Sequence, residues 1–251
     1  MECKMKLKDK IALVTGAGSG MGRATAQEFT AAGARVICLD LNCDAAQATA
    51  SGLAGAIGAS CDVSNSVQVA DVCAKSEADM GRIDILVNCA GILDGYAPVT
   101  ETSDALWDKI IGVNLKGMFL VSRAVLPGMV TRGYGVIVNI SSIAGLVAGG
   151  GGAAYTASKH GVIGLTRQMS YDYGKHGIRT NAICPGAVET AMTKEILTSG
   201  DMAVMELVRS VPAGRHGQPE EIAKMALYLA SDDASFVHGA VMAIDGGWTV
   251  K

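Results

Sequence analysis

Tyr155 and Lys159 lie four residues apart in a stretch with helical spacing, so a helix would place the phenol and the ammonium on one face. Ser142 comes thirteen residues before Tyr155, at the end of a β-rich run. A hydroxyl, a phenol and an ammonium that meet at the carboxyl edge of a sheet could hold a carbonyl oxygen and pass a proton to it. A Tyr/Lys pair at this spacing is common by chance, so only its combination with Ser142 indicates carbonyl reduction or alcohol oxidation.

A glycine-rich segment, Thr15-Gly16-Ala17-Gly18-Ser19-Gly20-Met21-Gly22, follows the first β-rich run and precedes a helical stretch. Glycines there permit a tight turn and let a pyrophosphate approach the backbone amides at the helix N-terminus, where the dipole favours an anion. Asp40 ends the second β-rich run, where a carboxylate can accept hydrogen bonds from a ribose 2′-hydroxyl. The alternatives are an ordinary glycine-rich turn and an Asp40 that caps the next helix.

Seven β-rich runs alternate with helical stretches such as 21–32 and 66–80, with Gly33 and Gly81 at the positions of C-terminal caps. Most runs are apolar on both faces, as in central parallel strands covered by helices. The pattern predicts an α/β fold with a single-domain, doubly wound (Rossmann) seven-stranded parallel sheet. The runs are Ile11–Thr15, Arg35–Leu39, Ala56–Cys61, Ile83–Asn88, Val136–Ile140, Arg179–Cys184 and Val241–Ile244.

The composition limits the possible functions of the 251 residues. A net charge of −3 excludes a nucleic-acid binder that works by bulk charge. Seven cysteines without a CxxC pair and four histidines without ligand spacing predict a reduced, metal-free protein. No run approaches the roughly 20 apolar residues of a membrane span, and no signal region is recognised, so we expect a cytoplasmic protein without membrane contact.

Taken in order, these motifs resemble those of the short-chain dehydrogenase/reductase family over essentially the whole chain. Each motif is weak alone, and together they are very specific. They comprise TGxxxGxG at Thr15, Gly16, Gly20 and Gly22, then Asp62-Val63, Asn88-Cys89-Ala90-Gly91, Asn114, Ser142, Tyr155-x-x-x-Lys159, Pro185-Gly186 with Val188 and Thr190, and Asp245-Gly246-Gly247.

The resemblance implies four catalytic residues. Tyr155 would be the general acid in reduction and the base in oxidation, and Ser142 would donate to the substrate oxygen. Lys159 would lower the pKa of the phenol and hold the nicotinamide ribose, and Asn114 would position a water that links Lys159 to solvent.

The resemblance also implies an NAD site. Simpler structural roles remain open for its members: Asp62 as a helix cap, the segment after Asn88 as a tight turn, and the segment after Pro185 as a helix entry. The implied cofactor residues are Gly16, Ser19, Gly20, Met21, Gly22, Asp40, Leu41, Asp62, Val63, Asn88, Ala90, Gly91, Tyr155, Lys159, Pro185, Gly186, Val188 and Thr190.

Residues 187–217 depart from the alternating pattern, with apolar residues spaced as in two short amphipathic helices broken at Ser199-Gly200. We expect a substrate lid there, which would keep water from the nicotinamide; packing against a neighbouring helix or subunit is the alternative. Lys194, Arg209 and Arg215 are the only cations of the segment, and no two of them form an obvious carboxylate clamp. With loops 93–96 and 143–153, the lid would surround a small or medium, uncharged secondary alcohol or ketone.

Three functions remain open, with an NAD-dependent alcohol or ketone oxidoreductase first. A 3-oxoacyl-acyl-carrier-protein reductase usually takes NADPH and docks an acidic carrier, but Asp40 opposes a 2′-phosphate, Ser19 replaces a frequent basic residue, and only Arg132 and Lys175 indicate a basic patch. A catalytically silent dinucleotide sensor or scaffold would be marked by the loss of Tyr155 or Lys159.

The resemblance finally implies a homo-oligomer, since many family members are tetramers. The contacts would be made by 106–129, 155–173 and the C-terminal strand.

Overall fold

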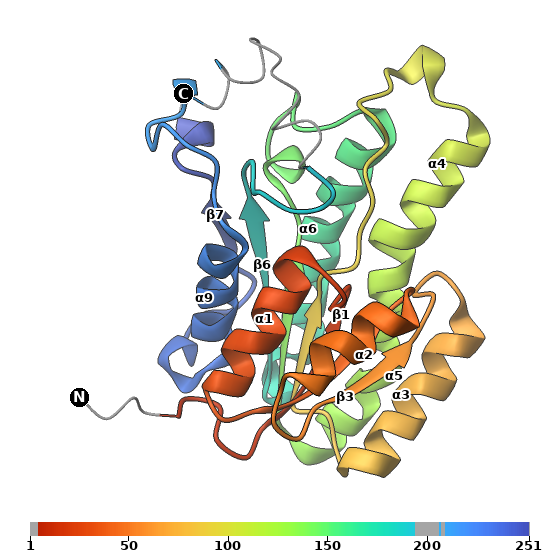
Figure 1. Cartoon of the computed structure of the whole chain (residues 1–251), viewed down its shortest axis with the longest axis vertical. Coiled ribbons are helices and arrows are strands. Elements are labelled where there is room, and N and C mark those ends of the chain that lie inside the picture. The colour runs from red at the N-terminus through yellow and green to blue at the C-terminus, as the bar shows by residue number, and fades with distance from the viewer. Residues whose placement is uncertain (1–4, 194–205, 207–208, 251) are drawn as a thin grey trace.

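The computed structural model describes residues 5–193, 206 and 209–250. In this part of the chain, seven parallel strands form one sheet in the order β3-β2-β1-β4-β5-β6-β7 (Figure 1). The predicted fold class is confirmed, and each predicted run becomes a strand with ends shifted by two residues or fewer. The strands are β1 (Ile11–Thr15), β2 (Arg35–Asp40), β3 (Ile57–Ser60), β4 (Ile85–Asn88), β5 (Gly135–Ile140), β6 (Ile178–Pro185) and β7 (Val241–Ile244).

Helices cover both faces of the sheet. α1, α2 and α9 pack on one face, and α3, α5 and α6 pack on the other (Figure 1). The α-helices are α1 (Gly20–Ala31), α2 (Cys43–Ser51), α3 (Ser66–Met80), α4 (Asp104–Ile111), α5 (Met118–Arg132), α6 (Ala153–Tyr173) and α9 (Pro219–Ala230). Short helical turns are η1 (Val99–Glu101), η2 (Gly112–Gly117), η3 (Ile143–Gly145), η4 (Gly174–His176), η5 (Asp232–Ala234) and η6 (Trp248–Val250).

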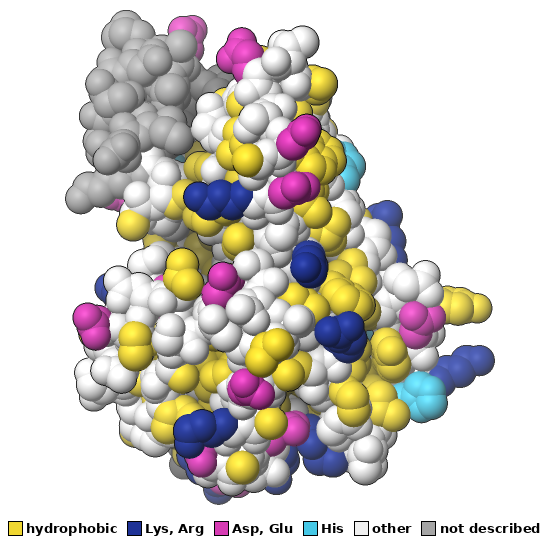
Figure 2. Space-filling model, turned by 90° about the vertical axis from the view of Figure 1, so that its right-hand side faces the viewer, with side chains coloured by type: hydrophobic (Ala, Val, Ile, Leu, Met, Phe, Trp, Pro, Cys, Tyr) yellow, Lys and Arg dark blue, Asp and Glu magenta, His cyan; other side chains and the backbone are white. Residues whose placement is uncertain are grey.

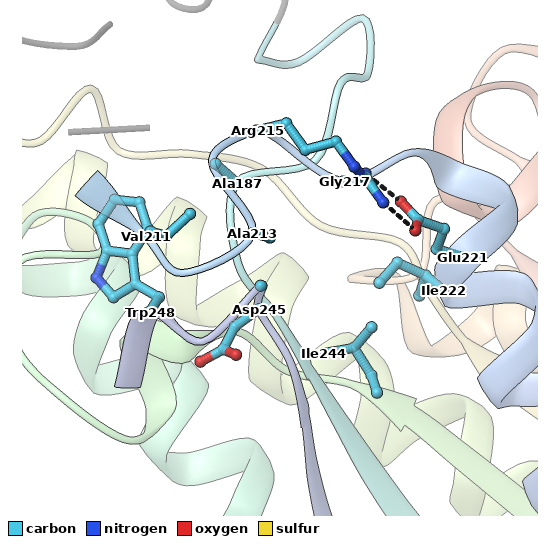
Figure 3. A pocket seen from close by; sticks show the side chains of 11 residues that line it. Ala187, Val211, Ala213, Arg215, Gly217, Glu221, Ile222, Ile244, Asp245 and Trp248 are labelled. Carbon is cyan, nitrogen blue, oxygen red and sulfur yellow. Dashed lines mark hydrogen bonds and ion pairs between the residues drawn. The ribbon is translucent and has the colours of Figure 1, made fainter. Parts of the chain in front are cut away.

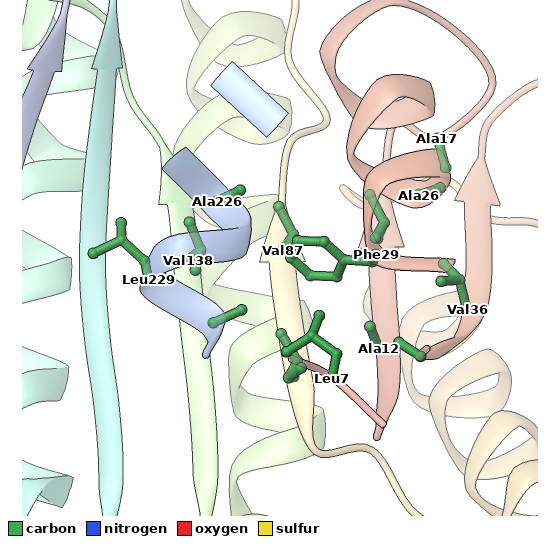
Figure 4. Close-up of a cluster of buried hydrophobic side chains, with 14 of the residues drawn as sticks. Leu7, Ala12, Ala17, Ala26, Phe29, Val36, Val87, Val138, Ala226 and Leu229 are labelled. Carbon is green, nitrogen blue, oxygen red and sulfur yellow. The ribbon is translucent and has the colours of Figure 1, made fainter. Parts of the chain in front are cut away.

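The core consists of two apolar layers, one on each face of the sheet. Phe29 of α1 and Leu229 of α9 are fully buried in one layer together with Val87 of β4 (Figure 4). Burying side chains of this size stabilises the fold by about 1.5–3 kcal/mol each. This packing holds α1, and therefore the turn before it, against the middle of the sheet.

α4, η2 and α5 form one continuous helical stretch, Asp104–Arg132, which is long and apolar enough by length and composition to cross a membrane. The expectation that no segment approaches such a span is therefore wrong. Half of the most apolar 18-residue part of this stretch is buried inside the fold, as in a core helix of a soluble protein. η2 is a π-helical turn, a feature frequent at functional sites, and it carries Asn114.

The turn between β1 and α1 depends on its glycines. Gly16 and Gly20 have φ values of 66° and 50°, which favour glycine. A Cβ at Gly22 would overlap the carbonyl oxygen of Gly16, so α1 can start this close to the turn only without a side chain there.

We predict that Gly22→Ala lowers the free energy of unfolding by about 1–3 kcal/mol, because the overlapping atom is rigid backbone. Gly164→Ala is the matched control: Gly164 lies exposed within α6, and a Cβ there meets nothing within 4 Å. It should stabilise the protein by roughly 0.5–1 kcal/mol. Urea unfolding of both variants checks this, and equal effects would contradict the described turn.

Candidate functional site

A cleft of about 420 Å³ lies at the carboxyl edge of the sheet, where the strand order reverses between β1 and β4. Open α/β sheets bind ligands at such a reversal. Most of the predicted cofactor residues line this cleft, hereafter the dinucleotide cleft. Its lining comprises Gly16, Ser19, Gly20, Met21, Gly22, Asp40, Leu41, Cys61, Asp62, Val63, Cys89, Ala90, Gly91, Ile92, Lys109, Val113, Thr190 and Met192.

The Asp40 carboxylate is held at the rim of the cleft by two backbone amides. Gly18 N donates to Oδ2 and Asn42 N donates to Oδ1, each at 2.9 Å. Asp40 is not the cap of α2, because Asn42 occupies that position and its side chain accepts from Ala45 N. Leu41 beside it is 73% exposed.

The turns after β1, β3 and β4 meet around the cleft. The Thr15 hydroxyl accepts hydrogen bonds from Cys89 N at 3.0 Å and from Ala90 N at 3.1 Å, which ties the end of β1 to the turn after β4. Asp62 accepts from the backbone and the hydroxyl of Ser64, while Asn65 caps α3. Asp62 is therefore a turn residue at the cleft wall.

Asn88 and Lys159 are the predicted cofactor residues that line neither this cleft nor the second cavity described below. The Asn88 side chain is 2% exposed and donates to Ser122 Oγ at 3.1 Å and to Asn139 Oδ1 at 2.9 Å. Asn139 in turn donates to Thr166 Oγ1. The network links β4 and β5 to α5 and α6, so the Asn88 side chain has an internal structural role, and its contact with the cofactor stays a prediction.

A second cavity of about 350 Å³, hereafter the catalytic cavity, adjoins the dinucleotide cleft through Met21, Thr190 and Met192. Ser142 and Tyr155, the expected catalytic hydroxyl groups, line it together with Pro185, Gly186 and Val188, which were expected on the nicotinamide side. The remaining lining residues are Leu93, Tyr96, Ser141, Ile143, Gly149, Gly150, Ala187, Thr193 and Trp248.

Burial controls the ionisation of the two central groups. It raises the pKa of the Tyr155 phenol to about 12, and a hydrogen bond with Ser142 acts in the opposite direction. It lowers the pKa of the Lys159 ammonium to about 8. We expected Lys159 to lower the pKa of the phenol, and the net shift is upward because desolvation of the phenol outweighs the hydrogen bond with Ser142.

Lys159 is fixed by the strand beside it. Its Nζ donates to Ile140 O at 3.0 Å and lies 5.5 Å from the centroid of the Tyr155 ring. Ser141 Oγ donates to the backbone carbonyl of Lys159 at 2.9 Å. The end of β5 therefore positions both Ser142 and the ammonium against α6.

The Asn114 side chain is fully buried and committed to protein partners. Its Oδ1 accepts from Ile92 N at 2.8 Å, and its Nδ2 donates to Ile92 O at 2.9 Å. Nδ2 also lies 3.3 Å from Ser158 Oγ. In this structure the carboxamide clamps the loop after β4 to the helix that carries Tyr155.

Trp248 and Lys109 line the two cavities, and the sequence predictions did not include them. Trp248 also borders a small cavity of about 70 Å³, which shares Ala187 and Trp248 with the catalytic cavity (Figure 3). At the other end of that cavity, Arg215 makes two hydrogen bonds to Glu221 at 2.7 and 2.8 Å. Only the tertiary fold brings the C-terminus to the site, so no local pattern indicates Trp248.

The expected lid, residues 187–217, is described only in part. Val188, Thr190, Met192 and Thr193 line the catalytic cavity. The two amphipathic helices expected between 192 and 208 fall mostly outside the described residues. Among the described residues, no group of three or more His, Cys, Asp or Glu side chains is placed to hold a metal ion.

Comparison with known proteins identifies the relatives of the chain. A family model described as enoyl-(acyl carrier protein) reductase matches residues 16–249. The 2-(S)-hydroxypropyl-CoM dehydrogenase 3 of Xanthobacter autotrophicus is 41% identical, over 97% of this chain and 98% of the relative. The 3-oxoacyl-acyl-carrier-protein reductase of Thermotoga maritima is 40% identical, over 98% and 100% respectively.

A solved structure agrees over the same length. The gluconate 5-dehydrogenase of Burkholderia cenocepacia, in complex with NADP and tartrate, superposes with a TM-score of 0.92 at 36% identity and covers 99% of this chain and 98% of that one. The chain belongs to the short-chain dehydrogenase/reductase family of NAD(P)-dependent oxidoreductases.

Proposed function

We propose that this chain interconverts a small or medium, uncharged secondary alcohol and its ketone with NAD as the preferred cofactor. The observation that carries the proposal is the placement of Tyr155 in the catalytic cavity that Ser142 also lines, with the Lys159 ammonium over its ring and the dinucleotide cleft adjoining. A phenol and a serine hydroxyl there can share one substrate oxygen.

The cleft fits a nicotinamide dinucleotide. Its glycines leave backbone exposed where Cβ atoms would fill the space: at Gly16 a Cβ would lie 3.0 Å from the Ala90 backbone, and at Gly20 3.2 Å from Thr190. Ser19, Gly20 and Met21 would hold the pyrophosphate at the start of α1, with Asp40 on the adenosine ribose. When bound, the cofactor supplies or accepts the hydride, and Pro185, Gly186, Val188 and Thr190 border the nicotinamide side.

The residues of this chain handle the proton. In reduction, Tyr155 Oη gives its proton to the substrate oxygen, and in oxidation the phenolate takes it back. Ser142 steadies that oxygen with a hydrogen bond in both directions. Lys159, charged below its pKa of about 8, holds positive charge near the phenol when the proton leaves.

Tyr155→Phe should fold, bind NAD and lose roughly 10²–10⁴ in kcat, because only the proton donor is removed. Ser142→Ala should lose roughly 10²–10³, as for loss of one oxyanion donor. Steady-state kinetics give kcat, and titration with NADH by fluorescence serves as the binding control. A Tyr155→Phe enzyme with near-normal kcat would overturn the assignment, whereas an inactive wild-type protein that binds NADH would favour the sensor or scaffold.

NAD preference follows from the fixed carboxylate of Asp40. A 2′-phosphate at the ribose would meet like-charge repulsion on the order of 4 kcal/mol at an effective dielectric constant near 20. Two cations lie nearby: Lys109 lines the cleft, and the Arg23 guanidinium is bonded to Gly18 O and Thr49 Oγ1. Neither pairs with Asp40 within salt-bridge distance in the described structure.

The kcat/KM for NAD should exceed that for NADP. Asp40→Ala should lower the ratio of these two values, because it removes the repulsion between the carboxylate and the 2′-phosphate. Asp44→Ala, which removes an exposed carboxylate in the first turn of α2, is the matched control and should leave the ratio unchanged. Equal or higher kcat/KM for NADP in the wild-type enzyme would refute the preference.

The cavity lining supports a neutral substrate. Leu93, Ile143 and Val188 form aliphatic walls, and Met21 and Met192 can adapt their shape to different substrates. No Lys or Arg side chain lines the catalytic cavity among the described residues. Arg215, a cation of the expected lid, lines the small cavity instead, where it is paired with Glu221.

A matched series of secondary alcohols and 2-hydroxy acids of equal carbon skeleton should show higher kcat/KM for the neutral members, because the cavity offers no charge to pair with a carboxylate. Cyclohexanol and 2-butanol are suitable neutral members, and 2-hydroxybutanoate is the charged counterpart of 2-butanol. A charged substrate with kcat/KM tenfold above every neutral analogue, about 1.4 kcal/mol in transition-state binding, would refute the proposal.

The similarity to the 3-oxoacyl-acyl-carrier-protein reductase of Thermotoga maritima makes that activity the second candidate function of this chain. The two cations expected to dock a carrier, Arg132 and Lys175, precede β5 and β6 and so lie at the amino edge of the sheet, opposite the cavities. Arg132 also donates to Ile83 O and lies 4.0 Å from Glu77. This placement favours the small-molecule substrate.

We also infer a cytoplasmic homo-oligomer, a tetramer by the family resemblance. Trp107 and Phe119 are each 42% exposed on the α4–α5 stretch, and Figure 2 shows hydrophobic side chains gathered on the face that carries α4. β7 ends the sheet with an outer edge that no described strand pairs, and open edges pair readily with another chain. The six described cysteines are free, as in a reducing compartment.

A further inference from the structure

Asp94 carries a buried carboxylate in the loop after β4. It is 4% exposed, and no described Lys, Arg or His lies within salt-bridge distance of it. Three backbone amides satisfy it instead: Tyr96 N and Gly152 N donate to Oδ1 at 3.1 and 2.9 Å, and Tyr155 N donates to Oδ2 at 2.8 Å. A buried charge needs such partners to be tolerated.

Two of these bonds cap α6 from outside its own chain segment. The helix begins after Gly152, which has no side chain to cap it, so Asp94 satisfies the amide of this cap residue and the amide of Tyr155 in the first turn. A Cβ at Gly152 would lie 2.6 Å from Asp94 Oδ2 and from the Ala97 backbone, so the glycine lets the carboxylate reach the helix. A carboxylate at a helix N-terminus is also favoured by the dipole.

The third bond holds a strained turn in the wall of the catalytic cavity. Tyr96 has a φ of 62°, a conformation that residues with a Cβ rarely adopt, and it follows Gly95 at 69°. The Tyr96 side chain lines the catalytic cavity. One carboxylate therefore fixes the backbone of both phenol-bearing residues of the cavity.

We propose that Asp94 is a positioning residue of the reaction, which locks the first turn of α6, and so Tyr155, to the loop that carries Tyr96. The inference rests on the proposed role of Tyr155 as acid and base. Asp94 does not touch the reacting atoms, and it acts through the backbone of Tyr155 and through its charge.

The charge of Asp94 also acts on the phenol. After burial, the groups that affect the pKa of Tyr155 are Ser142, which lowers it, and Tyr96, Asp94 and Cys184, which raise it; Lys159 lies over the ring. Removing the Asp94 charge therefore lowers the pKa of the phenol.

The test compares Asp94→Asn with Asp94→Glu, which keeps the charge but lengthens the side chain. The matched control is Asp84→Asn. Asp84 is equally buried and accepts from Ile11 N at 2.9 Å, but it lies at the amino end of β4, away from the site. The readouts are single-turnover hydride transfer with NAD and the best neutral alcohol of the matched series, its pH profile, and the ultraviolet tyrosinate signal that Tyr155→Phe removes.

Asp94→Asn should slow hydride transfer on the order of 10²-fold, as expected when a reacting group is misplaced by about 1 Å. It should change the KM for NAD less than twofold. It should also move the acid limb of the pH profile of oxidation to lower pH, because the phenolate of Tyr155 forms more readily without the Asp94 charge. Asp94→Glu should slow hydride transfer without moving the acid limb of the pH profile. Asp84→Asn should lower the free energy of unfolding and leave the rate and the pH profile unchanged.

An Asp94→Asn rate within threefold of wild type, or an unmoved acid limb and tyrosinate signal, would overturn the inference. If Asp94→Asn does not fold, the hydride-transfer rate of Asp94→Glu becomes the test. A wild-type rate in Asp94→Glu would then overturn the inference. If Tyr155→Phe retains activity, the proposed function itself is wrong. If Tyr155→Phe is inactive but Asp94→Asn transfers hydride at the wild-type rate, only the positioning role of Asp94 is wrong.

Discussion

Burial of the parallel sheet on both faces is the constraint on which the rest of this structure depends. Every residue of β1, β4, β5 and β6 is buried, so these strands offer no side chain to a ligand along their length. Polar groups can meet a ligand only where the strands end, and the reversal of strand order between β1 and β4 opens a crevice there. The dinucleotide cleft and the catalytic cavity both lie at this edge.

The same burial explains why the sheet and most of the cleft could be predicted from sequence. Runs such as 136–140 are apolar at every position except Asn139, which is the pattern that two covered faces require. Glycines and carboxylates directly after such runs must then fall at the sheet edge. Gly16, Asp40 and Asp62 all line the cleft for this reason.

Sequence patterns do not reveal the features that depend on tertiary surroundings. The last residue of a strand can point into the core or out of the edge, and Asn88 points into a network with Ser122 and Asn139. The pKa of Tyr155 depends on how completely the fold removes water from the phenol, which spacing to Lys159 does not reveal. Asp94 lies in the loop 93–96 that was expected at the site, but nothing in the local sequence indicates that it binds the amides of Gly152 and Tyr155. Trp248 reaches the site from the C-terminal segment, and its local sequence does not indicate that contact.

The π-helical turn of η2 has a consequence for how the long α4–α5 stretch can change during evolution. A π turn holds one residue more than an α turn, so it acts as a one-residue insertion that shifts every later side chain by about 100° around the axis. α5 thereby faces the sheet with Val121, Val125 and Met129. Deleting one residue between 112 and 117 would restore a regular helix. The helix would then lose either the hydrogen bonds of Asn114 to Ile92 or the contact of the apolar face of α5 with the sheet. We therefore expect related sequences to lack insertions and deletions in this turn, although helical geometry alone would accept them.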